Sequence, residues 1–376
     1  MQIYVVKQGD TLFSISREFN ISVEELERLN AITAQRLVVG QALIVDPTPE
    51  RIGTAFINGY AYTNINRDVL RTALPYMTSL TIFGYGFNEN ADLIPIDDSE
   101  LISLAYEFNV VPIMLLSTIT ESGNFSTQHA ATVMQDPSIT QRLIDNVISL
   151  MNEKGYRGID IDFEFVAPEN RVDYINFIRA FAERLNPLGY TVNVDLAPKT
   201  SANQVGLLYE SHDYRGIGEV ANTVLAMTYE WGYTYGPAMA VAPINQVSRV
   251  LNYALTEIPP QKILMGIPNY AYDWTLPFVK GESEAVTIGN EQAIEIAFNN
   301  NAQIMFDEES QTPFFNYTST DGTLHEVWFE DVRSITQKLK LINQFGILGG
   351  GYWNLMRPFT QNWIALNSVY NIEKIL

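Results

Sequence analysis

The segment Gly158-Ile159-Asp160-Ile161-Asp162-Phe163-Glu164 alternates apolar and acidic residues. In an extended strand, successive side chains point to opposite faces, so the three acids share one face and the apolar residues share the other. This pattern is typical of a strand in a closed barrel, whose apolar face meets the surrounding helices. We therefore expect the acidic triplet (Asp160, Asp162 and Glu164) to point into a barrel, towards the C-terminal mouth where active sites of such barrels lie.

Carboxylates spaced about 6–7 Å apart along one strand face cannot all ionise cheaply in a partly dry interior. At least one pKa should therefore rise, which places a proton donor beside an acceptor. Two other interpretations are an exposed edge strand and a calcium-binding loop with the same spacing. The two isoleucines and Phe163 argue against an exposed edge, because they belong in a core. The same β-formers stand where a calcium loop needs turn-forming Gly and Asn.

The chain from residue 51 onward alternates apolar strand patterns with helical ones, such as the amphipathic segment 138–153. Eight such alternations favour an α/β fold of the (β/α)8 TIM-barrel type. A long gap before the eighth strand, at about 272–329, predicts a small α+β insertion. Its expected elements are a helix near 291–299 and strands at 303–306, 313–317 and 324–329. The eight predicted barrel strands are 52–59, 79–84, 110–116, 158–163, 191–197, 223–229, 262–268 and 346–353.

The first 46 residues predict a separate β-α-α-β module. Apolar runs at 3–6 and 42–45 indicate strands, and Thr11 and Ser22 each stand before a helical pattern as a cap. Asp46-Pro-Thr-Pro-Glu50 then interrupts regular structure, because proline lacks the backbone donor. We expect a module at 1–46, a linker at 47–51 and a barrel at 52–376.

Composition narrows the range of partners. Lys and Arg number 23 and Asp and Glu 43, so the formal charge is −20, and neither nucleic acid nor an anionic membrane is an expected partner. There is no cysteine for a disulfide or a thiolate zinc site, and no run approaches the roughly 20 apolar residues of a membrane span. The N-terminus lacks the features of an ordinary signal peptide. His129, His212 and His325 are scattered, so we expect surface or capping roles for them and neither metal nor cofactor.

The acidic segment resembles the fourth-strand pattern D-G-x-D-x-D-x-E of glycoside hydrolase family 18, the chitinase-like family. It departs from this pattern at Arg157, and the family's third-strand Ser-x-Gly-Gly is replaced by Leu116-Ser117-Thr118-Ile119. Met227-Thr228-Tyr229-Glu230-Trp231 is similar to the family's Met-x-Tyr-Asp, with Glu230 in place of Asp. Gly349-Gly350-Gly351-Tyr352-Trp353 carries a tryptophan where the family has its cleft floor. These departures suggest a distant branch of the family.

The resemblance implies a retaining, substrate-assisted glycosidase. Glu164 would protonate the glycosidic oxygen, Asp162 would stabilise the substrate's acetamido group, Asp160 would share a proton with Asp162, and Tyr229 would hold the acetamido oxygen. Aromatic side chains suit sugar faces. For Tyr60 and Phe87, packing in the core is an open alternative to a cleft role. The substrate-binding residues that the resemblance implies are Trp353, Met227, Glu230, Trp231, Tyr60 and Phe87.

The N-terminal module resembles a LysM domain, a wall-glycan-binding family. The resemblance rests on residues 4–15, Tyr4-Val5-Val6-Lys7-Gln8-Gly9-Asp10-Thr11-Leu12-Phe13-Ser14-Ile15, and on Asn30 with residues 37–41. It implies sugar contacts at Asp10, Thr11, Leu12 and Ile32. Asp10 and Thr11 could instead form only a turn and a helix cap.

A LysM-like module joined to this barrel resembles the wall hydrolases of spore-forming bacteria. We therefore expect cleavage of GlcNAc β-1,4 bonds in peptidoglycan, in spore cortex during germination, by a monomer located in the spore coat, cortex or cell wall. Alternatives are a chitinase or other endo-N-acetylglucosaminidase, and a catalytically silent glycan-binding lectin. Such lectins usually lack one acid of the triplet, whereas this chain keeps all three.

Overall fold

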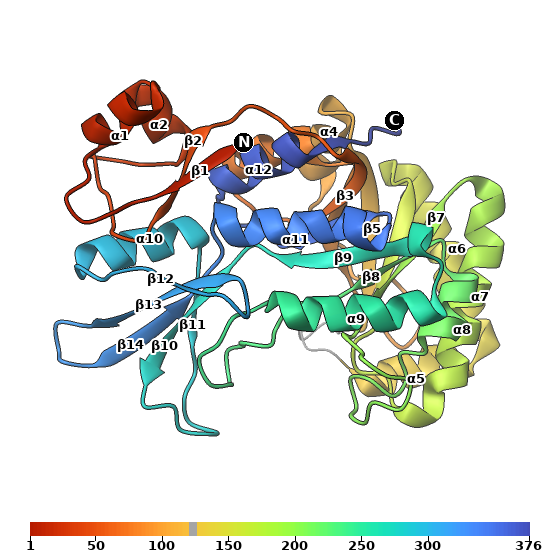
Figure 1. The fold of residues 1–376 in the computed structure, drawn as a ribbon. Helices are drawn as coiled ribbons and strands as arrows, with labels where there is room; N and C mark the ends of the chain where they lie inside the picture. Colours follow the sequence, from red (N-terminus) through yellow and green to blue (C-terminus); the bar gives the residue numbers. More distant parts are fainter. Residues whose placement is uncertain (120–125) are drawn as a thin grey trace.

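The computed structural model describes residues 1–119 and 126–376 as a parallel barrel with an N-terminal module and an insertion (Figure 1). Each barrel strand pairs in parallel with the next, and pairing of the last with the first closes the ring, so the predicted TIM barrel is confirmed. A ninth strand, β16 (Tyr370–Ile372), pairs with the start of the first barrel strand. The eight barrel strands are β3 (Gly53–Tyr62), β4 (Ser79–Tyr85), β5 (Val111–Ser117), β6 (Gly158–Asp162), β7 (Thr191–Leu196), β8 (Thr223–Ala226), β9 (Ile263–Pro268) and β15 (Gly349–Trp353).

The sixth barrel strand is shorter than the sequence predicts. The predicted range was 223–229, but β8 ends at Ala226. The backbone then turns tightly, because the Thr228 N–H donates to the Ala226 carbonyl and the Tyr229 N–H donates to the Met227 carbonyl, each at 2.8 Å. The apolar run therefore continues past the point where strand pairing stops.

The helices outside the barrel begin and end at strong local signals. In α6 (Pro137–Lys154), the Asp136 side chain caps the first turn, and Gly155 takes a left-handed φ of 85° at the other end. The helix buries one face and turns its polar face to solvent. The other barrel helices are α3 (Arg67–Ala73), α4 (Ser99–Glu107), α5 (Thr127–Gln135), α7 (Arg171–Leu185), α8 (Tyr214–Val220), α9 (Ile244–Glu257), α11 (Val332–Phe345) and α12 (Thr360–Val369), with 3-10 turns η1 (Leu74–Tyr76), η2 (Pro168–Asn170), η3 (Asn186–Leu188) and η4 (Pro260–Lys262).

The insertion between β9 and β15 is an antiparallel sheet with one helix, as the sequence predicts. The sheet order is β11-β10-β14-β13-β12. Two of its strands, β10 and β11, were not predicted, because β10 follows β9 after only Asn269 and Tyr270. The elements are β10 (Ala271–Leu276), β11 (Val286–Ile288), α10 (Asn290–Asn299), β12 (Met305–Asp307), β13 (Thr312–Thr318) and β14 (Leu324–Trp328).

The N-terminal module has the predicted β-α-α-β order. Its elements are β1 (Gln2–Val5), α1 (Leu12–Phe19), α2 (Val23–Leu29) and β2 (Ala42–Asp46), with β1 and β2 antiparallel. Thr11 and Ser14 form a capping box at the start of α1. A small core of its own holds the module together: Val6, Leu12, Ile15, Leu26, Ile32, Leu43 and Val45.

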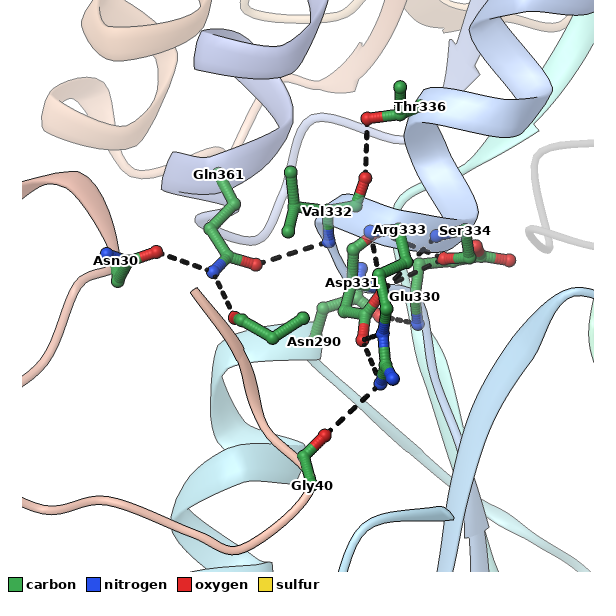
Figure 2. Close-up of polar contacts among 11 residues, drawn as sticks. Asn30, Gly40, Asn290, Glu330, Asp331, Val332, Arg333, Ser334, Thr336 and Gln361 are labelled. Carbon is green, nitrogen blue, oxygen red and sulfur yellow. Dashed lines mark hydrogen bonds and ion pairs between the residues drawn. The ribbon is translucent and has the colours of Figure 1, made fainter. Parts of the chain in front are cut away.

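The module is docked onto the barrel and its insertion (Figure 2). The Gln361 amide donates to Asn30 Oδ1 and to the Ala42 carbonyl, both at 2.8 Å, and its oxygen accepts from the Val332 N–H. The Ile304 N–H donates to the Val39 carbonyl at 2.9 Å. Apolar side chains continue the contact, since Leu29, Ala42 and Ile44 pack in the barrel core and Val38 in the core of the insertion.

Candidate active site

The acidic triplet lies at the C-terminal end of β6. Asp160 and Asp162 are buried within the strand, and Glu164 follows two residues after its end. The intervening Phe163 points the other way and stacks on Phe87 and Tyr174, with ring centroids 6.0 Å apart in each pair. Alternation along the strand therefore separates a buried acidic face from a buried aromatic one.

A cavity of about 390 Å³ opens beside the triplet. Asp162 and Glu164 line it together with residues that follow β7 and β8 and with Trp353 at the end of β15. A polar cavity with several aromatic walls is suited to a sugar ring, whose hydroxyls need hydrogen bonds and whose faces need apolar contact. The remaining lining residues are Asp195, Pro198, Leu208, Tyr209, Met227, Tyr229, Glu230 and Tyr272.

Burial raises the pKa values of the triplet. The pKa of Asp160 rises to about 6, although hydrogen bonds from Tyr60 and Asn193 oppose the rise. The pKa of Asp162 lies well above its ordinary value, mainly because the carboxyl group is buried and further because Glu164 and Asp160 carry negative charge nearby. The pKa of Glu164 is raised by burial and then by the charge of Glu230. A carboxyl group with a raised pKa can keep a proton near neutral pH and give it to a leaving group.

Asp162 has an oxygen available for a ligand. Its Oδ1 is buried and has no hydrogen-bond partner among the residues that the structure describes. Ser117 pairs with Asp162 in the β5–β6 register, and its Oγ is likewise buried and unpartnered within residues 1–119 and 126–376. Buried polar atoms are normally satisfied, so this corner of the site is suited to receive a polar group.

A fourth acid, Asp195, belongs to the same site and was missed in the sequence. The Tyr60 hydroxyl lies 2.8 Å from Asp160 Oδ2 and 2.8 Å from Asp195 Oδ1. Asn193 donates to Asp160 Oδ1 at 2.6 Å. The signal was present, because Asn193 and Asp195 alternate with apolar residues along β7 just as the acids do along β6.

The predicted cleft aromatics fall into two groups. Trp353 lines the cavity and makes edge contacts with Tyr60, Tyr62 and Phe83, at centroid distances of 5.7, 6.0 and 5.5 Å. Tyr60 is fully buried against Trp353, and its hydroxyl contacts Asp160 and Asp195. Phe87 packs behind the site on Phe163 and does not line the cavity, so its placement matches the alternative of core packing.

The segment after β8 separates two cavities. Tyr229 and Glu230 line both the cavity of the triplet and a second one of about 340 Å³, which Trp231 also lines. Glu230 has a left-handed φ of 66°, which is uncommon for a residue with a side chain. Its carboxylate accepts hydrogen bonds from the Tyr270 and Tyr272 hydroxyls. These bonds fix Glu230 at the junction of the two cavities.

The expected surface or capping role of His212 is wrong, because the residue is completely buried behind the triplet. Its Nδ1 accepts from the Ala197 N–H at 2.8 Å, so Nε2 carries the proton and donates to the Phe163 carbonyl at 3.2 Å. Burial lowers its pKa to about 4. His212 therefore ties the end of β6 to the end of β7.

The other two histidines lie elsewhere. His129 is half-buried near the start of α5, where its backbone N–H donates to Ser126 Oγ. The ring of His325 contacts Asp273 within the insertion, at 2.9 Å. Over residues 1–119 and 126–376, no cluster of three or more His, Asp and Glu has the arrangement of a metal site.

The module residues that the sequence singles out have structural partners. Asp10 Oδ2 accepts from the Lys7 N–H and the Tyr4 hydroxyl, and Thr11 caps α1. The side chains of Leu12 and Ile32 are buried in the core of the module. Any sugar contact at Leu12 and Ile32 would therefore have to use their backbone groups.

Comparison with known families settles the membership of the chain. The profile of the Glycosyl hydrolases family 18 matches residues 82–357, which include the triplet, Tyr229 and Trp353. The chain belongs to glycosyl hydrolase family 18. The LysM domain profile matches residues 4–46. The family 18 chain is therefore a glycoside hydrolase with a glycan-binding module.

Individual relatives extend this match over the full length of the family 18 chain. It is similar to the cortical fragment-lytic enzyme of Bacillus subtilis, with 39% identity over 100% of this chain and 99% of the relative. The crystal structure of the Bacillus cereus spore cortex-lytic enzyme SleL superposes with a TM-score of 0.83, at 36% identity, and covers 99% of this chain and 87% of that one. The crystal structure of the Bacillus megaterium QM B1551 spore cortex-lytic enzyme SleL superposes with a TM-score of 0.83 at 35% identity. It covers 100% of this chain and 87% of that one.

None of the described helices combines the length and apolar character needed to cross a membrane.

Proposed function

We propose that this family 18 enzyme hydrolyses N-acetylglucosaminyl β-1,4 bonds in spore cortex peptidoglycan during germination. The observation that carries the proposal is the acidic triplet, from which Asp162 and Glu164 line a cavity together with Tyr229 and Trp353 while Asp160 lies buried behind them. Cortex as the substrate rests on the relatives, which are a cortical fragment-lytic enzyme and spore cortex-lytic enzymes that align over almost the whole chain. A location in the spore coat, cortex or cell wall and action as a monomer are part of the same proposal.

The proposed mechanism is retaining and substrate-assisted. Glu164, whose raised pKa keeps a proton available, protonates the glycosidic oxygen. The acetamido oxygen of the substrate attacks the anomeric carbon, so no nucleophile of the enzyme is needed. Asp162, with its unpartnered Oδ1, accepts from the acetamido N–H and stabilises the cyclic oxazolinium ion. Glu164 then takes a proton from the water that opens this ring.

The other cavity residues bind the sugar. Tyr229 holds the acetamido oxygen in line for attack, and the indole of Trp353 supports the ring of the sugar before the cleaved bond. Met227, Glu230 and Trp231 contact the sugar from the segment after β8. The LysM module holds the glycan through Asp10, Thr11 and the backbone of Leu12 and Ile32.

Replacing Glu164 with Gln tests the catalytic assignment. The amide keeps the shape of the side chain but has no acidic proton to transfer to the leaving group, so kcat should fall by about 10²-fold or more. Binding of the variant to insoluble peptidoglycan should remain unchanged. The matched control is Glu169→Gln, because Glu169 is exposed in η2 on the same loop. Equal turnover of Glu164→Gln and wild type would exclude Glu164 as the acid.

Product analysis tests the bond and the substrate. Purified cortex, vegetative peptidoglycan and chitin are digested, and mass spectrometry identifies the new reducing ends. We expect GlcNAc at the reducing end and the highest rate on cortex or its fragments. NMR of the first product formed should show the β anomer. Products ending in muramic acid would contradict the proposed bond, and an α anomer formed first would contradict the retaining, substrate-assisted mechanism. Faster cleavage of chitin would favour a chitinase.

A further inference from the structure

The hydroxyl of Tyr60 contacts two acids on different strands, although it has only one proton to donate. Its hydroxyl lies 2.8 Å from Asp160 Oδ2 on β6 and 2.8 Å from Asp195 Oδ1 on β7. A phenol has one O–H to donate, so it can satisfy only one of two ionised carboxylates. The second contact is a hydrogen bond only if that carboxyl group itself carries a proton. The geometry therefore requires one protonated acid in the Asp160–Tyr60–Asp195 group.

The surroundings decide which acid holds this proton. Asp160 Oδ1 accepts from the Asn193 amide at 2.6 Å, and Thr223 donates to Asn193 Oδ1 at 2.7 Å, which fixes the amide with its N–H towards Asp160. Amide donors stabilise the ionised form of a carboxyl group. Burial raises the pKa of Asp195 well above its ordinary value, and the charges of Asp160 and Asp162 add to this effect, whereas the pKa of Asp160 rises only to about 6. The proton therefore belongs on Asp195.

We propose that Asp195 is a fourth functional acid of the site, a positioning residue that stores a proton and passes it through Tyr60 to Asp160. The inference rests on the proposed function. In the substrate-assisted mechanism that the family resemblance implies, Asp160 shares a proton with Asp162, and Asp162 takes this proton with it when it turns to the acetamido group, so Asp160 loses it. The O–H bond of Asp195 then breaks as a new O–H forms on Tyr60. At the same time the original phenol proton moves to Asp160, so the negative charge moves from Asp160 to Asp195.

The position of Asp195 at the cavity makes this charge shift useful. The titratable groups that interact electrostatically with Asp195 are Tyr60 on β3, Asp160 and Asp162 on β6, Glu164 after β6, Tyr229 after β8 and Tyr174 on α7, all of them acids or phenols. Asp195 also lines the cavity of the triplet, so a charge placed there faces the developing oxazolinium cation. Electrostatic stabilisation of such charge is strong in a site that excludes water.

Two variants separate a proton store from a hydrogen-bonding support. Asp195→Asn keeps the shape and can donate to Tyr60, but it cannot release a proton. Tyr60→Phe keeps both acids and removes the bridge. In each variant, kcat on soluble cortex glycan fragments should fall about tenfold or more at pH 7, with KM within about twofold. The loss should shrink as the pH is lowered towards 5, because Asp160 can then take its proton from solution.

The control is Asp98→Asn. Asp98 is also a buried acid bonded to phenols, those of Tyr85 and Tyr156, but it lies outside the cavity and pairs with Lys154. This variant should lower the melting temperature and leave the pH profile of kcat unchanged.

The outcomes are distinguishable. A wild-type pH profile in Asp195→Asn, or a loss that is equal at every pH, would overturn the inference and leave Asp195 a structural residue. Absence of any GlcNAc-releasing activity in the wild type would instead refute the proposed function. If Asp195→Asn does not fold, the profile of Tyr60→Phe decides alone.

Discussion

At the scale of single residues, the site is held by hydrogen bonds that cross between strands. Tyr60 links β3 to β6 and β7, and His212 links the ends of β6 and β7 through the Phe163 carbonyl and the Ala197 N–H. Glu230 is fixed in a left-handed conformation by Tyr270 and Tyr272. The reactive acids are therefore placed by partners far away in sequence, which supports precise positioning.

Removing the charge of Glu230 should shift the pH dependence of activity. The charge of Glu230 helps to raise the pKa of Glu164, so Glu230→Gln should lower that pKa. Glu164 must be protonated to act as the acid, so the alkaline limb of kcat should move to lower pH. The measurement is kcat from pH 5 to 9. If Glu230→Gln only loses a contact with the sugar, kcat should fall equally at every pH and the alkaline limb should stay at the same pH.

His212 should make the folded protein less stable in acid. Its pKa is about 4 when folded and 6.5 ordinarily, so the unfolded chain binds more protons between these values. The free energy of unfolding contributed by this ring therefore falls as pH drops from about 6.5 to 4, by about 3 kcal/mol in total.

Comparison of wild type with His212→Gln isolates this effect from that of the buried acids. The difference in unfolding free energy between the two, measured by urea titration at several pH values, should change over this pH range. A difference that is constant from pH 4 to 7 would contradict the prediction.

At the scale of elements, the glycine run in β15 closes the barrel. Gly349 pairs with Phe56 of β3, and a Cβ added at Gly349 would lie 1.7 Å from the Phe56 carbonyl oxygen. No side chain fits there without moving one of the two strands. This close approach explains why the strand that closes the ring begins with glycine.

Gly349→Ala should therefore destabilise the fold by about 3 kcal/mol or more, because a backbone atom cannot move aside as a side chain can. Thermal and urea unfolding measure the loss. Gly53→Ala is the control, since Gly53 begins β3 and a Cβ there would meet only Tyr370, at 3.9 Å. Similar stabilities of the two variants would show that β15 can shift away from β3.

At the scale of the whole molecule, the module and the barrel form a continuous structure. Gly40 lies at their junction with a φ of +89°, and a Cβ there would lie 1.9 Å from the Ile304 carbonyl oxygen. Arg333 donates a hydrogen bond to the Gly40 carbonyl at 3.3 Å. Together with Gln361, these contacts set the orientation of the module relative to the barrel (Figure 2).

Gly40→Ala should release the module from the barrel. Limited proteolysis should then cut within residues 47–51 much faster than in the wild type, and small-angle scattering should show a larger radius of gyration. Gly9→Ala is matched, because Gly9 has a φ of +90° but open space around it. It should cost only the strain of the left-handed conformation, about 1–2 kcal/mol, and leave the junction intact. Equal resistance of both variants to protease would argue against a rigid junction.

The sequence alone determined the barrel, the insertion, the module and the position of the acidic triplet. These features follow from local periodicity, because the alternation along 158–164 and the repeated strand and helix patterns can each be recognised within a short stretch of sequence. Only the tertiary structure placed His212 behind β6, joined Tyr60 to acids 100 and 135 residues away, and docked the module against Gln361. The physical reason is that a buried polar group must find its partner wherever the fold brings one, and no short window of sequence records which partner that is.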